Sequence, residues 1–268
     1  MEMISLLKAI QFVKIFQKGG RTQPWLIQVQ VEGGRVPYVV KLFKSDEVDN
    51  ENTVAREVFG SLLASEFDIP TPDFALIYFS NEFIDTLPEY ARKILNFRDS
   101  RMKFGVVYCA NNQLLSADLP SHQLKKMIHE TANIFAFDTL INNKDRGRYK
   151  TNILVSTISD DYYIFDHERA FKRIPFLIDE IKANRFPEVL KQHVFFSYLS
   201  HRKNKIELFQ TFYEYLRVLN PEILSDYNRR LEEYDLHHGE ITKIISYLYM
   251  LKQKPDWFVK ILIDSISK

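Results

Sequence analysis

The sequence is poor in cysteine and has no long apolar run. Its single cysteine, Cys109, excludes a disulfide framework and is typical of a protein from a reducing compartment. No apolar stretch approaches the ~20 residues that a membrane-spanning helix needs. The N-terminal residues lack the basic flank and the long apolar segment of a signal peptide. We therefore expect a cytoplasmic protein that does not bind a membrane.

An excess of charge of one sign is also missing. The formal net charge is +1 at pH 7, although 26% of the residues are charged. Such a balance argues against a broad surface for nucleic acid, so we expect no direct nucleic-acid partner. With 46% hydrophobic residues, a chain of 268 residues can form one large domain or two lobes with separate cores.

The most informative stretch is rich in Asn, Asp and aromatic residues. Two short apolar runs, Ile153–Val155 and Tyr162–Phe165, are separated by a polar loop, which predicts an antiparallel hairpin. Asn152 directly precedes the first strand and Asp166 directly follows the second, so their side chains should meet at the mouth of the hairpin. Their oxygens are the hard ligands that suit the Mg²⁺ of a nucleotide. Asp145, on a polar loop upstream, adds an oxygen group that could orient a hydroxyl.

Asp and Asn also cluster in ordinary turns, because they hydrogen-bond their own backbone. A single such motif would carry little weight. The ordered set of Asn143, Asp145-Arg146, Asn152 and Asp166 instead indicates the catalytic loop and the metal loop of a phosphoryl-transfer enzyme.

The spacing within this set departs from the common protein-kinase pattern, in which the metal-binding Asn follows the catalytic Asp by five positions. The residue five positions after Asp145 is Lys150, and Asn152 follows at seven. Two interpretations remain open. Either Gly147 lets the loop bulge so that Asn152 reaches the metal, or the second metal site is missing and Lys150 supplies positive charge to the phosphates.

The N-terminal part of the sequence predicts β-structure. Apolar and polar residues alternate over Trp25–Val31, a turn follows at Glu32–Arg35, and Tyr38–Phe43 should return as the next strand. The loop before this hairpin contains Gly19 and Gly20, whose backbone N–H groups could turn toward an anion, next to Arg21. Such a loop could cover nucleotide phosphates, although a Gly-Gly pair is more often a simple turn.

Lys41 lies among apolar residues, and an ammonium group in such surroundings needs a partner. We expect that partner to be Glu57, on a helix that begins near Asn50 or Asn52 and ends at about Glu66. The alternative for Lys41 is an edge-strand lysine that points to solvent. Further strands are predicted at Phe74–Phe79 and Lys103–Ala110, with a polar crossing after them.

From Ser121 onward the sequence is mainly helical. The first helix leads into the Asp145 loop and carries Asp138 on its apolar stripe, where either support of the loop or a surface position would fit. Amphipathic helices are predicted at Leu190–Leu199, Ile206–Val218, Pro221–Tyr234, Ile241–Leu251 and Trp257–Ile266.

The motifs Asn143-Lys144-Asp145-Arg146, Asn152-Ile153-Leu154 and Ile164-Phe165-Asp166-His167-Glu168, in this order, resemble those of the HipA-like kinase family. That family belongs to the phosphatidylinositol-kinase-related branch of the protein kinase fold. The resemblance spans most of the first 170 residues. It implies an α+β, two-lobed protein-kinase-like fold, with a small β-rich N-lobe over residues 1–110 and a mainly helical C-lobe over residues 111–268.

The resemblance also implies ATP and Mg²⁺ as cofactors, bound in the cleft between the lobes. Asp145 would orient the acceptor hydroxyl and take its proton, and Arg146 would support the loop. Asn152 and Asp166 would hold the metal. The residues expected at the nucleotide are Gly19, Gly20, Arg21, Thr22, Lys41 and Glu57. Thr22 would also be the hydroxyl that autophosphorylation modifies, as on the corresponding loop of the family.

The function implied is that of a serine/threonine protein kinase. Family members act as toxins of toxin–antitoxin pairs, and the antitoxin partner would here be a separate protein. One alternative stays open, a phosphotransferase that acts on a small-molecule hydroxyl. The sequence argues against another, a pseudokinase that binds a nucleotide or a partner without catalysis, because roles can be assigned to all of Lys41, Glu57, Asp145, Asn152 and Asp166. The spacing of the motifs does not say whether the acceptor is a protein.

Overall fold

The computed structural model describes residues 4–17, 22–116, 128–186 and 189–267. The chain divides into two compact units. The first unit comprises residues 1–58, 72–110 and 226–239, and the second comprises residues 59–71, 111–225 and 240–268. The boundary at residue 58 falls inside a continuous helix, α2 (Thr53–Glu66).

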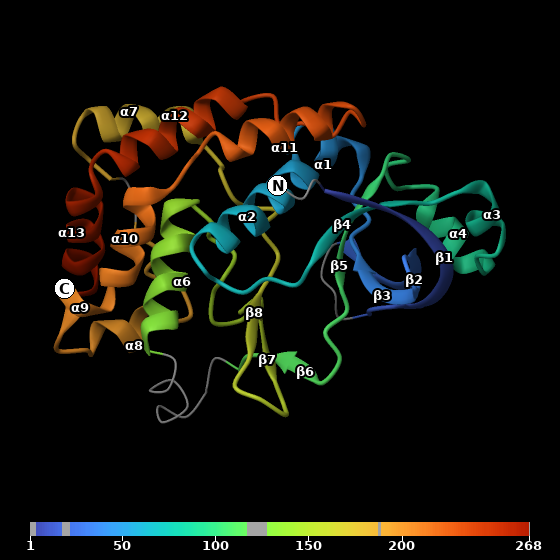
Figure 1. The fold of residues 1–268 in the computed structure, drawn as a ribbon, viewed down its shortest axis with the longest axis horizontal. Coiled ribbons are helices and arrows are strands. Elements are labelled where there is room, and N and C mark those ends of the chain that lie inside the picture. Colours follow the sequence, from blue (N-terminus) through green and yellow to red (C-terminus); the bar gives the residue numbers. More distant parts are fainter. Residues whose placement is uncertain (1–3, 18–21, 117–127, 187–188, 268) are drawn as a thin grey trace. The chain divides into compact units, whose positions relative to one another are not determined.

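The first unit is built on a closed five-stranded β-barrel with the strand order β1-β2-β3-β5-β4 (Figure 1). Its strands are β1 (Ser5–Ile15), β2 (Trp25–Val31), β3 (Gly34–Val40), β4 (Phe74–Tyr78) and β5 (Lys103–Val107). Only the β1–β4 pairing is parallel. Alternate side chains fill the interior, because successive residues of a strand face opposite sides; Trp25, Ile27 and Val29 of β2 are fully buried.

The predicted strand Trp25–Val31 is confirmed, but the returning strand is not Tyr38–Phe43. β3 begins at Gly34, which pairs with Val31 across a tight turn. Gly33 makes this turn possible, because its φ of +85° is unfavourable for residues with a side chain. Lys41 therefore lies just beyond the strand, where its backbone N–H donates to the carbonyl of Phe104 (3.0 Å).

Three short helices complete the N-terminal part of the first unit: α1 (Ser45–Asp49), α3 (Asn81–Asp85) and α4 (Glu89–Leu95). Each has seven residues or fewer, too few to show a clear helical period in the sequence. Residues 226–239 also belong to this unit, although they are remote in sequence. Arg101 donates to the carbonyl of Asp235 (2.7 Å), which ties this segment to the start of β5.

The predicted helix over residues 50–66 is confirmed as α2. The helix is buried on nearly all sides from Thr53 to Ala64, whereas Ser65 is exposed. A helix that is buried all round shows only a weak amphipathic pattern in its sequence.

The second unit combines a small sheet with helices. The sheet has the order β6-β7-β8, with β6 (Asn112–Leu114), β7 (Ile153–Ser156) and β8 (Tyr162–Ile164). The helices that lie wholly within it are α6 (Ile128–Leu140), α7 (Ile174–Lys182), α8 (Phe196–Ser200), α9 (Lys205–Leu208), α10 (Gln210–Val218), α12 (Ile241–Lys252) and α13 (Pro255–Ile266). α11 (Ile223–Glu232) runs from the second unit into the first.

Aromatic side chains form much of the core of the second unit. Phe67, at the end of α2, stacks on Phe212 of α10 with ring centroids 5.0 Å apart and lies 5.8 Å from Phe137 of α6. α10 packs against α6 and α13, and α12 packs against α7. α6 is thereby held rigidly where it leads into the Asp145 loop.

One expectation for this unit is wrong. The predicted helix Leu190–Leu199 is helical only from Phe196, because residues 189–195 take an irregular path along the Asp145 loop. The polar stretch after Ala110, where a crossing is predicted, contains the strand β6. Residues 121–127 lie outside the described residues, so only the part of the first predicted helix from Ile128 is seen.

None of the helices that the structure describes is both long enough and apolar enough to cross a membrane.

Candidate active site

The predicted hairpin is present, and its mouth holds the two residues that are expected to supply oxygen ligands. β7 and β8 pair with Ile153 opposite Ile164, and the backbone N–H of Phe165 donates to the carbonyl of Asn152 (3.1 Å). Asn152 and Asp166 both have left-handed backbone conformations, with φ of 49° and 68°. Asn and Asp tolerate this region better than other side-chain-bearing residues, and such outliers are common at functional sites.

The Asp145 loop is hydrogen-bonded to this mouth. The Asn152 amide nitrogen donates to the backbone carbonyl of Asp145 (3.1 Å) and lies 3.4 Å from its carboxylate. The backbone N–H of Asp145 donates to the side-chain oxygen of Asn143 (3.3 Å). The structure therefore brings Asp145 and Asn152 together, seven positions apart in the sequence.

Lys150 connects the two acidic residues of the site. Its ammonium nitrogen lies 2.5 Å from a carboxylate oxygen of Asp145 and 2.7 Å from one of Asp166. Partial burial would lower the pKa of Lys150, but the charge of Asp166 and the hydrogen bond to Asp145 outweigh burial and raise it. Lys150 is thus a cation under physiological conditions, held between the two acids.

Arg146 is a buried positioning residue. Its side chain is fully buried, and one guanidinium nitrogen donates to the carbonyls of Asn152 and Phe165 (3.3 Å to Phe165). These carbonyls lie on the two sides of the hairpin mouth. Arg146 therefore fixes the mouth relative to the Asp145 loop, in keeping with the supporting role expected for it.

Asp138, on α6, holds the other side of Arg146. Its carboxylate accepts from Arg146 Nε (2.5 Å) and from the Asn143 amide (3.1 Å), and it lies 3.0 Å from His193 Nε2. Because the backbone N–H of Phe195 donates to His193 Nδ1 (3.2 Å), the ring proton sits on Nε2 and is donated to Asp138. Asp138 supports the loop and has no surface position, which resolves the two alternatives left by the sequence.

The charges of this network are set by its burial and its partners. Burial alone would raise the pKa of Asp138, but the charge of Arg146 and the hydrogen bond from His193 bring it to about 2. Burial lowers the pKa of His193 and outweighs the opposing effect of Asp138. The network is therefore an ion pair of Asp138 and Arg146 with a neutral histidine.

In the first unit, the predicted ion pair between Lys41 and Glu57 is confirmed. The two side chains are only 12% and 1% exposed, so the edge-strand alternative for Lys41 is wrong. Gly19, Gly20 and Arg21 lie outside the described residues. Thr22 is 5% exposed, so a phosphate on its hydroxyl would require this residue to move out of its buried position.

A glycine of α2 allows the chain after Asp166 to approach the helix. A Cβ atom on Gly60 would lie 2.3 Å from Cβ of His167, a distance that real atoms do not reach. Only glycine fits here without displacing the backbone that carries Asp166. The role of Gly60 was not predictable from the sequence, because a lone glycine within a helical pattern has no distinctive signature.

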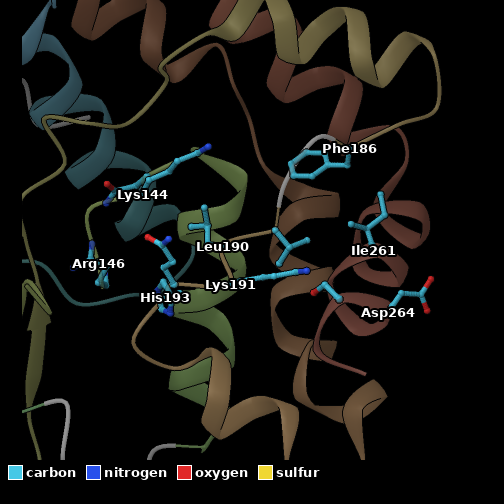
Figure 2. A pocket seen from close by; sticks show the side chains of 12 residues that line it. Lys144, Arg146, Phe186, Leu190, Lys191, His193, Ile261 and Asp264 are labelled. Atoms are coloured by element: carbon cyan, nitrogen blue, oxygen red, sulfur yellow. The ribbon is translucent and has the colours of Figure 1, made fainter. Parts of the chain in front are cut away.

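A pocket of about 740 Å³ lies on one side of the Asp145 loop (Figure 2). Lys144, Arg146 and His193 line one wall, and Phe186, Ile261 and Asp264 line the opposite wall, with Leu190 and Lys191 between them. Asp145, Lys150 and Asp166 are not among the described residues that line it. A molecule in this pocket would contact the neighbours of Asp145 but not the acidic site itself.

Comparisons with known proteins agree with this arrangement. The sequence matches the family described as HipA-like kinase over residues 10–233. The fold is similar to the crystal structure of the Helicobacter pylori proinflammatory kinase CtkA, with a TM-score of 0.58 and 14% sequence identity. The match covers 98% of this chain and 99% of that chain. No curated protein matches the sequence. The mixed α+β fold, with a β-rich N-terminal region and a helical C-terminal region, is therefore that of a kinase.

Proposed function

The chain belongs to the HipA-like kinase family, and we propose that it is an ATP-dependent kinase that phosphorylates serine or threonine residues of a protein. The observation that carries the proposal is the convergence of Asp145, Asn152 and Asp166 at the mouth of the β7–β8 hairpin. This convergence places the Asp145 carboxylate, which would face the acceptor hydroxyl, next to two residues that can supply oxygen ligands to a metal. Phosphoryl transfer requires these groups in this order along the chain.

The chemistry of the donor set fits magnesium. Asp166 offers a carboxylate and Asn152 an amide oxygen, both hard ligands, and the residues are only 8% and 3% exposed. The Asn152 nitrogen is engaged with Asp145, so the amide oxygen is the atom left to ligate a metal. When bound, Mg²⁺ would neutralise charge on the β- and γ-phosphates.

We assign the other roles by chemistry. Asp145 orients the acceptor hydroxyl; as the hydroxyl oxygen bonds to the γ-phosphorus and the bond to ADP breaks, Asp145 takes the hydroxyl proton. Lys41, fixed by Glu57, contacts the α- and β-phosphates. Arg146 does not touch the reacting groups and acts by holding the loop and the hairpin mouth in place.

The test is to incubate the purified chain with radiolabelled ATP, Mg²⁺ and a cell lysate. Label transferred to protein and recovered as phosphoserine or phosphothreonine supports the proposal. Label in small solutes would indicate a small-molecule phosphotransferase, and no transfer despite ATP binding would indicate a pseudokinase.

Asp145→Asn is the variant that separates chemistry from binding. The change removes the proton acceptor but keeps the size of the side chain and leaves the phosphate ligands in place. We expect ATP affinity within about threefold of the parent and a loss of turnover of at least about hundredfold. Loss of ATP affinity with turnover retained at saturation would make Asp145 a binding residue.

We further propose, from family membership, that the chain is the toxin of a toxin–antitoxin pair with a separate antitoxin protein. Induced expression of the chain should then arrest bacterial growth, whereas expression of Asp145→Asn to the same level should not. Equal growth of both cultures, with the parent shown to be active, would contradict this role.

A further inference from the structure

Lys150 occupies a position that the proposed function leaves without a role. The residue lies five positions after Asp145, where common protein kinases have the Asn that binds their second Mg²⁺. Its ammonium contacts both Asp145 and Asp166, at 2.5 and 2.7 Å. A lysine cannot ligate a metal while it is protonated, so this position cannot serve the second metal ion.

Asn152 does not provide a second metal site in place of position 150. Its amide nitrogen is committed to Asp145, and its backbone carbonyl accepts from Arg146 and from Phe165. With Asp166 it can complete one metal site, because each contributes an oxygen. Asn152 and Asp166 thus provide oxygens for one divalent ion, and Lys150 adds an organic cation beside them.

We propose that the Lys150 ammonium replaces the second metal ion, so that the site works with one Mg²⁺ per nucleotide. The inference rests on the proposed function, since it assigns a charge within the same phosphoryl-transfer site. Lys150 then contacts the transferring phosphoryl group. A nearby cation stabilises the negative charge on the oxygens of this group in the transition state.

The geometry of Lys150 suits this role. Its side chain is 49% exposed, on the loop between Asp145 and Asn152, so the flexible four-carbon stem can reach a ligand without any backbone shift. Asp145 and Asp166 carry like charges, and one ammonium shared between them offsets their repulsion. A second divalent ion would have to displace the ammonium from the two carboxylates. It would then lie close to the positive charge of the ammonium, which is unfavourable.

The stoichiometry of metal binding tests the inference without reference to turnover. Mn²⁺ should be titrated into the full chain saturated with a non-hydrolysable ATP analogue, and bound ions counted by electron paramagnetic resonance. We expect one Mn²⁺ per chain for the parent. We expect two for Lys150→Asn, which places an amide at the spacing of common protein kinases. Two ions bound to the parent would overturn the inference.

Turnover provides the second measurement. Lys150→Met should lower the rate of phosphoryl transfer about hundredfold and change the affinity for the ATP analogue less than tenfold. Lys150→Arg, which keeps the charge, should restore part of the rate. Lys203→Met, at an exposed position outside the site, is the control. A Lys150→Met rate equal to the control would show that Lys150 is only a surface ion-pair partner.

These outcomes distinguish the inference from the proposed function. If the parent binds no metal–nucleotide complex, the proposed function fails and the inference fails with it. If it binds the complex with two Mn²⁺, only the inference fails. Should Lys150→Met prove unfolded by circular dichroism, the count of Mn²⁺ on the parent still decides.

Discussion

At the scale of single residues, Asp138 links several residues of the site. One buried carboxylate holds Arg146, Asn143 and His193, and Arg146 in turn holds both sides of the hairpin mouth. A buried ion pair contributes little net stability, but removal of one partner leaves a charge buried without compensation. The position of Asp145 thus depends on a residue seven positions upstream.

Asp138→Asn should therefore lower the free energy of unfolding by about 3–5 kcal/mol, because Arg146 would remain charged and buried. Urea denaturation followed by circular dichroism measures the change. Asp264→Asn is the matched control, since it removes an exposed carboxylate paired with Lys260 and should cost at most about 1 kcal/mol. Equal effects of the two substitutions would show that the buried network carries no special weight.

Lys103 is a buried residue whose contribution to the stability of the fold depends on pH. It is 4% exposed in the first unit and donates to the carbonyl of Arg101, and burial lowers its pKa from 10.5 to about 8. Between these two values the unfolded chain binds the extra proton and the folded chain does not, so stability rises with pH. The rise from this group should approach about 3 kcal/mol.

The measurement compares the parent with Lys103→Met in urea titrations from pH 7 to pH 10.5. Tyrosines titrate in the same range, so only the difference between the two proteins reports on Lys103. The parent should gain stability relative to Lys103→Met as the pH rises. Parallel curves would mean that the ammonium is better solvated than its burial indicates.

At the scale of elements, α2 closely approaches the chain after β8. Gly60 and His167 are in contact there, and His167 directly follows Asp166. The helix thus limits where the chain that carries Asp166 can lie after β8. This contact cannot accommodate a larger side chain at Gly60, because the atoms involved belong to or adjoin the backbone.

Gly60→Ala should displace His167 and with it Asp166. We expect a loss of stability of about 1–3 kcal/mol and a weakened dependence of ATP binding on Mg²⁺. Gly239→Ala is the control, because a Cβ at that position meets nothing within 4 Å. Calorimetric titration of ATP with and without Mg²⁺ would show the effect, and unchanged binding by Gly60→Ala would refute the link between α2 and Asp166.

At the scale of the whole molecule, the proposed nucleotide should change the stability of the chain. A ligand that binds the native chain and not the unfolded chain stabilises the native state by mass action. The metal–nucleotide complex should therefore protect the chain against heat.

At a concentration of Mg²⁺–ATP about 100 times the dissociation constant, the stabilisation is about 2.7 kcal/mol, or about 5–10 °C in the melting temperature. Differential scanning fluorimetry measures the shift. Chelation of the metal and the variant Asp166→Ala should each remove most of it. A full shift for Asp166→Ala would count against the assignment of Asp166 as the metal ligand.

Features that depend on neighbours along the chain were predictable without the structure. The β7–β8 hairpin, the strand Trp25–Val31 and the helix α2 follow from alternation, helical period and turn residues over fewer than twenty positions. The order of the Asp, Asn and Asp motifs was also sufficient to indicate the family. The pairing of Lys41 with Glu57 was predictable because a charge among apolar residues requires a partner.

Only the tertiary structure decided the features that depend on contacts between remote segments. His193 comes to Asp138 because residues 189–195 abandon a helical pattern to follow the Asp145 loop, where the backbone N–H of Val194 bonds to the carbonyl of Arg146 (3.0 Å). The closure of the barrel, the position of Gly60 and the contacts of Lys150 have the same origin. Local propensities are weak, of the order of 1 kcal/mol per residue or less, so the burial and hydrogen bonding of remote partners override them.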